Sequence, residues 1–137
     1  MRKKIKEAQK NSGTRISAES PPNYHTMYPI FSLERIQQGD FCFSNLETSD
    51  KAAFADSIFK RRTLTWEKVQ SEDRHKLGSE KISKKSIKAT IPKFITEDEQ
   101  NFLALRFNGL KAMVGYKVNN IFYVLWFDPK FKLYDHG

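Results

Sequence analysis

Residues 102–128, FLALRFNGLKAMVGYKVNNIFYVLWFD, consist of three apolar runs separated by Asn108-Gly109 and Asn119-Asn120. Asn-Gly is the strongest short signal for a β-hairpin, because both residues of a type I′ turn need positive φ. Asn-Asn also tolerates the left-handed backbone conformation. We therefore expect three antiparallel strands joined by two tight turns, which together form a three-stranded meander.

The turn at Asn108-Gly109 predicts how the first two strands pair. A two-residue loop places Arg106 directly opposite Lys111, and the second loop places Lys111 opposite Asp128. Two opposed cations cost on the order of 0.2–1 kcal/mol. In one interpretation Asp128 neutralises Lys111 and leaves Arg106 free to bind a phosphate. In the other, Asp128 neutralises both cations and the rings around them belong to the core.

Side chains alternate between the two sides of a strand, so this pairing divides the meander into two faces. One face is almost wholly apolar and is expected to form the core under the helices. The second face is mixed, and its expected members are Phe102, Ala104, Arg106, Lys111, Met113, Gly115, Lys117, Phe122, Val124, Trp126 and Asp128. On that face Trp126 is a candidate to stack on a nucleic-acid base, beside the phosphate that Arg106 would hold.

Two helices are expected before the meander. The stretch TSDKAAFADSIFKRR has apolar residues at helical spacing, which predicts a helix over 49–62 with Ser49 as its N-cap. The stretch TLTWEKVQ predicts a second helix over 65–70, capped by Thr63 or Thr65. Both helices are expected to cover the apolar face of the sheet.

The segments PIFSLERI and FCFSNLE are short and apolar, and they predict one or two N-terminal strands. A long basic connection, residues 71–95, precedes the meander, and long connections are often functional. The expected fold class is α+β: a small antiparallel sheet, made of the C-terminal three-stranded meander plus an N-terminal strand, with two helices on one face. We expect residues 28–137 to form a single globular domain and residues 1–27 a basic disordered arm.

The formal net charge is +8, and the basic residues are concentrated in two segments. Residues 1–27 hold six basic and two acidic side chains, and residues 74–93 hold seven basic and one acidic. This clustering favours an anionic partner, RNA or other nucleic acid first and an acidic protein second, over a merely solvated surface. The candidate nucleic-acid-binding residues are Lys76, Lys81, Lys84, Lys85, Lys88, Lys117 and Trp126.

The sequence has no spacing typical of a bound metal or cofactor. Its three histidines and its single cysteine, Cys42, have no ligand spacing, and it contains no P-loop or dinucleotide fingerprint. No apolar run is long enough to span a membrane, and the basic N-terminus lacks the apolar region of a signal peptide. A single cysteine excludes an intrachain disulfide. These features predict a cytoplasmic protein with no cofactor.

Two further residues are candidates for proton transfer. His136 follows the last expected strand, and a histidine can give or take a proton near neutral pH during RNA cleavage. A histidine so near the chain's end is more often frayed. Glu80 is the only acid in residues 74–93 and is a candidate general base, although a local ion-pair partner is the commoner role for such a residue.

The order of strand, two helices, basic connection and antiparallel meander resembles the RelE/YoeB-type toxin fold over roughly residues 28–137. The resemblance implies a small, basic, ribosome-dependent mRNA endonuclease of a toxin–antitoxin system, with an acidic antitoxin protein as partner. It implies metal-free catalysis in which cations, here Arg106 and Lys111, stabilise the phosphorane. Arg106 would match the family's sheet arginine and His136 its C-terminal histidine, and Glu80 is the nearest counterpart of its catalytic glutamate.

Two other functions fit the same sequence features. A non-catalytic nucleic-acid-binding module would use the basic arm and residues 74–93 for binding alone. A protein-interaction domain of the inhibitor or immunity type would use the same charge to bind an acidic partner. Growth arrest on expression distinguishes the toxin from both alternatives, and salt-dependent RNA binding without cleavage selects the binding module.

Overall fold

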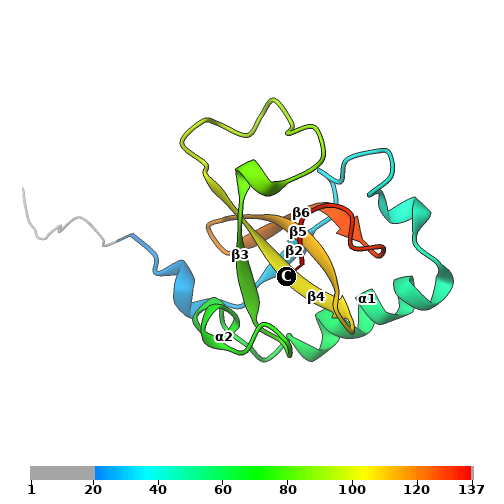
Figure 1. The fold of residues 1–137 in the computed structure, drawn as a ribbon. Helices are drawn as coiled ribbons and strands as arrows, with labels where there is room; N and C mark the ends of the chain where they lie inside the picture. The colour runs from blue at the N-terminus through cyan, green and yellow to red at the C-terminus, as the bar shows by residue number, and fades with distance from the viewer. Residues whose placement is uncertain (1–20, 137) are drawn as a thin grey trace, which may run out of the picture.

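The computed structural model describes residues 21–136, which form an α+β fold with one mixed sheet (Figure 1). The helices and strands are β2 (Ile30–Ser32), α1 (Thr48–Lys60), α2 (Trp66–Ser71), β3 (Ser79–Ser83), β4 (Asn101–Asn108), β5 (Lys111–Val118) and β6 (Ile121–Asp128), with short 3-10 helices η1 (Tyr24–Thr26), η2 (Phe43–Asn45) and η3 (Lys84–Ser86). The strand order is β2-β6-β5-β4-β3. β2 runs parallel to β6, and every other pair is antiparallel.

The expected α+β class and the C-terminal meander are confirmed, but the sheet is mixed rather than antiparallel, because β2 runs parallel to β6. Of the one or two N-terminal strands expected, one forms as β2, and residues 41–47 contain η2. β3 forms inside the connection that was expected to lack regular structure, and it pairs with β4 at the edge of the sheet. Residues 1–20 of the expected arm lie outside the described residues. No helix in residues 21–136 is long and apolar enough to cross a membrane.

Both helices form close to where the sequence predicts them. α1 follows Glu47 as its N-cap rather than Ser49, and the Glu47 side chain makes no capping hydrogen bond. α2 is capped as expected by Thr65, whose side-chain oxygen accepts from the backbone N–H of Lys68. The indole N–H of Trp66 donates to the carbonyl of Asn120 at 2.8 Å, which fixes α2 to the β5–β6 turn.

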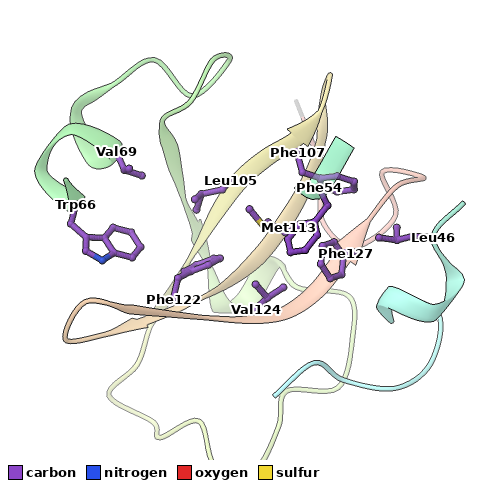
Figure 2. Packing of buried hydrophobic residues seen from close by; sticks show 10 residues of the cluster. All are labelled: Leu46, Phe54, Trp66, Val69, Leu105, Phe107, Met113, Phe122, Val124 and Phe127. Atoms are coloured by element: carbon purple, nitrogen blue, oxygen red, sulfur yellow. The ribbon is translucent and has the colours of Figure 1, made fainter. Parts of the chain in front are cut away.

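The helices cover one side of the sheet, which we call the helix face. Its core is dominated by aromatic rings that meet edge to face, as Phe54, Phe107 and Phe127 do. Figure 2 shows the ten buried residues of this cluster: Leu46, Phe54, Trp66, Val69, Leu105, Phe107, Met113, Phe122, Val124 and Phe127. This packing holds α1 and α2 against β4, β5 and β6.

The opposite side of the sheet, which we call the tail face, is buried as well. The segment between η3 and β4 and the residues after β6 pack on it, and Figure 1 shows that segment on the side of the sheet away from the helices. Its buried cluster is Ile82, Phe102, Ala104, Ala112, Val114, Tyr116, Leu125, Trp126, Leu133 and Tyr134. The sheet therefore has two cores, which explains why both faces of the meander read as apolar in the sequence.

Two β-bulges change the register that simple alternation predicts. Between β4 and β5 the paired residues are Arg106 with Ala112 and Asn108 with Lys111, so Phe107 is an extra residue. Between β5 and β6 the register shifts in the same way, and Leu125 is the extra residue. The expected Arg106–Lys111 pair is therefore wrong, because the bulge moves the two cations out of opposition.

The two bulges also change which side of the sheet several side chains occupy. Asp128 is the partner of Ala112 rather than of Lys111. Met113, expected on the mixed face, belongs to the helix-face core, while Val114 belongs to the tail face. A one-residue slip sends every following side chain of a strand to the other side. The pairing of Val118 with Ile121 at the second turn is as expected.

Gly115 gives a direct test of the bulge at Leu125. A Cβ on Gly115 would lie 1.9 Å from the carbonyl oxygen of Tyr123, because the bulged strand approaches closely there. We expect Gly115→Ala to lower the free energy of unfolding by about 1–3 kcal/mol, the usual cost of overpacking. Urea unfolding followed by circular dichroism measures it.

The matched control is Gly109→Asn in the β4–β5 turn. Gly109 has φ of +58° and open space around its Cβ position, and asparagine tolerates this conformation. Its unfolding midpoint should stay close to that of the parent. An unchanged midpoint for Gly115→Ala would mean that β5 and β6 do not approach as described.

Candidate functional site

Three polar residues project from the tail face near one end of the sheet. Arg106, Ala112 and Asp128 form one row across β4, β5 and β6. Glu80 on the neighbouring strand β3 is the partner of Ala104, which stands two residues before Arg106 in β4 and therefore shares its face. Cross-strand partners share a face, so these three polar side chains all lie on the side that the C-terminal residues cover.

Glu80 and Arg106 form the centre of a charged cluster. Arg106 Nη2 lies 3.9 Å from Glu80 Oε1, and Arg74 Nη1 lies 2.7 Å from Glu80 Oε2. Arg106 Nη1 is 3.1 Å from His75 Nδ1, and Arg74 Nε is 3.4 Å from His75 Nε2. One carboxylate thus faces two guanidinium groups, and one imidazole bridges them. A neutral imidazole accepts at one nitrogen only, so its tautomer decides from which arginine it accepts.

The turn after α2 positions His75. The carboxylate of Asp73 accepts from the backbone N–H of His75 at 2.8 Å, and its carbonyl accepts from Lys76 and Gly78. The same His75 N–H holds the pKa of Asp73 below its ordinary value. Gly78 has a Cβ position only 2.1 Å from the carbonyl oxygen of Glu72, so a larger residue does not fit. This turn brings the imidazole back toward β3 and β4.

Asp128 fixes the end of the chain on the tail face. Its buried carboxylate accepts from the backbone N–H groups of Lys132 at 2.8 Å and Leu133 at 3.1 Å. It also accepts from His136 Nε2 at 2.7 Å. The His136 ring stacks on Tyr134 with ring centres 4.0 Å apart, and its side chain is 15% exposed. His136 is therefore held in a defined position despite its place near the chain's end.

Tyr134 contacts His136 and is also influenced by the charges of Glu80 and Arg106. Its hydroxyl is buried and has no hydrogen-bond partner among the described residues. Burial raises the pKa of Tyr134 to about 12; the charge of Glu80 acts in the same direction and that of Arg106 opposes it. The phenol is thus within electrostatic reach of the Glu80–Arg106 pair while its ring contacts His136. At neutral pH it keeps its proton and can donate a hydrogen bond to an anion.

These groups form the set that phosphate-ester chemistry needs. The two guanidinium groups of the cluster suit the non-bridging oxygens of a phosphate, because their planar donors match its geometry. Glu80 or His75 can accept a proton, and His136 or Tyr134 can donate one. Of the four residues predicted as catalytic, Glu80 and Arg106 lie within 3.9 Å of each other. His136 is bound to Asp128, which is in the same row of the sheet as Arg106.

Lys111, the fourth residue predicted as catalytic, lies elsewhere. Its Nζ is 2.9 Å from Oδ1 of Asp50, and the side-chain amide of Asn108 donates to the same oxygen at 2.9 Å. Burial would raise the pKa of Asp50, but the hydrogen bonds from Lys111 and Asn108 outweigh it and keep the pKa below its ordinary value. This buried carboxylate joins the first turn of α1 to the β4–β5 turn, so the role of Lys111 is structural.

Trp126 and Lys117, both predicted to contact nucleic acid, lie where they do not face the charged cluster. Trp126 is 1% exposed and meets Phe102 edge to face, so it cannot stack on a base. Lys117 lies over the ring of Trp66, with Nζ 5.4 Å from the ring centre, and burial lowers its pKa. Lys117 is on the helix face, away from Arg106.

The five lysines predicted to bind nucleic acid are spread over the connection. Lys76, Lys81 and Lys85 are exposed. Lys84 donates to the carbonyl of Thr96 at 3.3 Å, and Lys88 pairs with Asp135 at 2.9 Å. Of the five, Lys76 follows His75 directly and Lys81 follows Glu80 directly, so these two are the nearest in sequence to the charged cluster.

Arg74, His75 and Tyr134 are members of the site that the sequence did not predict. DRHKLGSE contains Arg74 and His75 next to each other and Glu80 five residues after His75, but no strand was predicted there. Tyr134 stands two residues before His136, and nothing in that spacing indicates that the two rings share a site. A predicted β3 pairing with β4 would have placed Arg74, His75 and Glu80 near Arg106.

No protein family, curated protein or solved structure matches the chain. Residues 21–136 contain no group of three histidine, cysteine, aspartate or glutamate side chains arranged to hold a metal ion. The function is therefore inferred from the geometry of the cluster around Glu80 and Arg106.

The Lys111–Asp50 contact predicts a loss of stability. Lys111→Met keeps the aliphatic stem and leaves the buried Asp50 carboxylate without its cation, which should lower the free energy of unfolding by about 1–3 kcal/mol. The contribution of Asp50 is present above its ordinary pKa of 3.8 and is lost as the pH falls through its lower folded value. The stability difference between parent and variant should therefore be largest near neutral pH and shrink as the pH falls through the folded pKa of Asp50.

Lys60→Met is the control for that change. Lys60 pairs with Asp56 at 2.9 Å, but both side chains are more than half exposed. Such a surface pair contributes about 0–1 kcal/mol. Urea and acid unfolding curves measure both variants, and equal stability losses would contradict the structural role of Lys111.

A substitution at Tyr134 is expected to change the free energy of unfolding in the opposite direction. Tyr134→Phe removes a buried hydroxyl that has no partner within residues 21–136, so the free energy of unfolding at pH 7 should stay equal or rise by about 1 kcal/mol. Its folded pKa of about 12 exceeds the ordinary 10.0, so between these values ionisation favours the unfolded chain. The variant should lose less stability than the parent from pH 10 to 12. A clear loss at pH 7 would show that the hydroxyl has a partner.

Proposed function

We propose that the protein is a toxin-like endoribonuclease that cleaves RNA with side chains alone, as part of a toxin–antitoxin system. The supporting observation is the convergence of Glu80, Arg106 and His75 with Tyr134 and His136 at one end of the tail face. Three of these residues, Glu80, Arg106 and His136, are among those that the sequence predicts as catalytic. An mRNA on the ribosome and an acidic antitoxin are the proposed partners.

The reaction begins with removal of a proton from a ribose 2′-hydroxyl by Glu80 or His75. The 2′-oxygen then attacks the adjacent phosphorus, and the bond to the 5′-oxygen of the next nucleotide breaks. His136 or Tyr134 protonates that leaving oxygen, which gives a 2′,3′-cyclic phosphate and a 5′-hydroxyl. Arg106 and its neighbouring arginine stabilise the extra negative charge on the phosphorane.

The exposure of the groups is consistent with this assignment. The side chain of Glu80 is 25% exposed and that of Arg74 is 49% exposed, whereas that of Arg106 is 9% exposed. A phosphate entering from the Arg74 side would meet both guanidinium groups. It would weaken their pairing with Glu80, which frees the carboxylate to accept a proton. The substrate thus competes for cations that the empty site keeps neutralised.

A non-catalytic nucleic-acid-binding module remains the second candidate. The observation that favours it is that Lys76, Lys81 and Lys85 are exposed on the connection, where they can contact phosphates without any chemistry. A protein-interaction domain for an acidic partner is the third candidate, on the same charge. Cleavage distinguishes the proposed function from both.

Variants of Arg106 test the proposed function most simply. The parent, expressed in bacteria from an inducible promoter, should arrest growth and produce new transcript ends. Arg106→Ala and Arg106→Lys should both reduce the yield of new ends about 10²–10³-fold, because one transition-state cation contributes roughly that factor and lysine lacks the planar fork. Glu80→Gln should also reduce cleavage.

Arg62→Ala is the matched control, since Arg62 is an exposed arginine near the end of α1 whose guanidinium packs over Phe59. It should arrest growth like the parent. Thermal melts of every variant separate loss of the site from loss of the fold. Cleavage that survives Arg106→Lys unchanged would contradict the assignment, and tight RNA binding without cleavage by the parent would select the binding module.

A further inference from the structure

A groove of about 280 Å³ lies beside the charged cluster, between α1, the turn after α2 and the β4–β5 turn. We call it the hairpin groove. It is lined by Ala53, Asp56, Ser57, Lys60, His75, Lys76, Leu77, Arg106, Phe107, Asn108 and Gly109. Its volume is at the small end of the range for ligand sites and suits a single nucleotide unit. His75 and Arg106 belong to the groove and to the charged cluster at once.

The hairpin groove is positively charged. Lys60 lies on one wall and Lys76 on another, and Arg106 lies at the side that meets the cluster. Of the described residues that line the groove, only Asp56 carries a carboxylate. Asp56 pairs with Lys60 at 2.9 Å, but both side chains are more than half exposed, so an incoming anion can displace this weak pair.

A buried cation lies directly behind the groove wall. Arg61 is 1% exposed, and its guanidinium donates to the carbonyls of Leu77 at 2.9 Å, Arg106 at 3.0 Å and Ser57 at 3.3 Å. All three of these residues line the groove. Burial lowers the pKa of Arg61 to about 10, so it remains charged at neutral pH. Its field adds to that of Lys60 and Lys76 at the wall.

We propose that the hairpin groove binds the phosphate and sugar of the nucleotide next to the cleaved bond. This proposal rests on the proposed function in one respect, which is that Arg106 holds the scissile phosphate. An RNA strand whose scissile phosphate is held by Arg106 and that continues past His75 enters the groove, because His75 and Arg106 belong to both sites. Lys60 and Lys76 then bind the second phosphate from opposite walls, and Arg61 contributes through its charge without contact.

Ligands with one or two phosphates distinguish binding at Arg106 from binding in the hairpin groove. A 2′-O-methyl uridine dinucleoside monophosphate has one phosphate, and the trinucleoside diphosphate has two; neither can be cleaved, because the attacking hydroxyl is blocked. The parent should bind the trinucleotide about tenfold more tightly than the dinucleotide, as one further charge-assisted contact allows. Dissociation constants come from the shifts of backbone amide resonances of Ala53 and Gly109 during NMR titration.

The variant Lys60→Ala/Lys76→Ala should lose this tenfold gain and bind the dinucleotide as the parent does. The matched control, Lys68→Ala/Lys93→Ala, removes two exposed lysines outside the groove and should keep the gain. Asp56→Asn removes the one acid of the groove and should tighten trinucleotide binding several-fold. This last variant gains function, so a failure to fold cannot imitate the expected result.

A gain that persists in the Lys60→Ala/Lys76→Ala variant overturns the groove proposal and leaves the proposed function in place. No binding of either ligand overturns the groove proposal, whereas the proposed function is overturned only by the absence of RNA cleavage. A gain that the groove variant abolishes, in a protein that does not cleave ordinary RNA, supports the groove and contradicts the catalytic part of the proposed function.

Discussion

The extra residue Phe107 in β4 moves Arg106 and Lys111 out of opposition, so that the two cations have different partners. Without this bulge, Arg106 and Lys111 would face each other and repel. With it, Arg106 lies in the same row as Asp128 on the tail face, and Lys111 reaches the buried Asp50 at the start of α1. Phe107 itself contributes its ring to the helix-face core. One inserted residue thus separates a structural ion pair from a candidate catalytic cluster.

The candidate site depends on that row being covered by the end of the chain. Asp128 is wholly buried, and it accepts two backbone N–H groups and the imidazole of His136. These bonds compensate the carboxylate for its loss of water. They also place Tyr134 over the sheet with an unpartnered hydroxyl near Glu80 and Arg106. A buried donor without a partner costs stability.

The sequence predicts the fold class, both helices and the meander, because each has a strong local signal: helical spacing, Thr65 as a cap, and Asn108-Gly109 as a turn. It does not reveal the bulges, because an extra residue leaves the apolar pattern almost unchanged when both faces of a sheet are buried. β3 escaped prediction because SEKIS is polar and lies at an edge. Glu80, Arg106 and His136 were named from chemistry alone, whereas the role of His75 needed the β3–β4 pairing to be seen.

The most direct measurement is the chemistry of the product ends. The purified protein would be incubated with ribosome–mRNA complexes, and the RNA fragments tested for the groups at their termini, with Arg106→Lys alongside. The account predicts fragments that carry 2′,3′-cyclic phosphate and 5′-hydroxyl ends, formed by the parent and almost absent for Arg106→Lys. Fragments with 5′-phosphate and 3′-hydroxyl ends, or no cleavage by a folded parent, would contradict it.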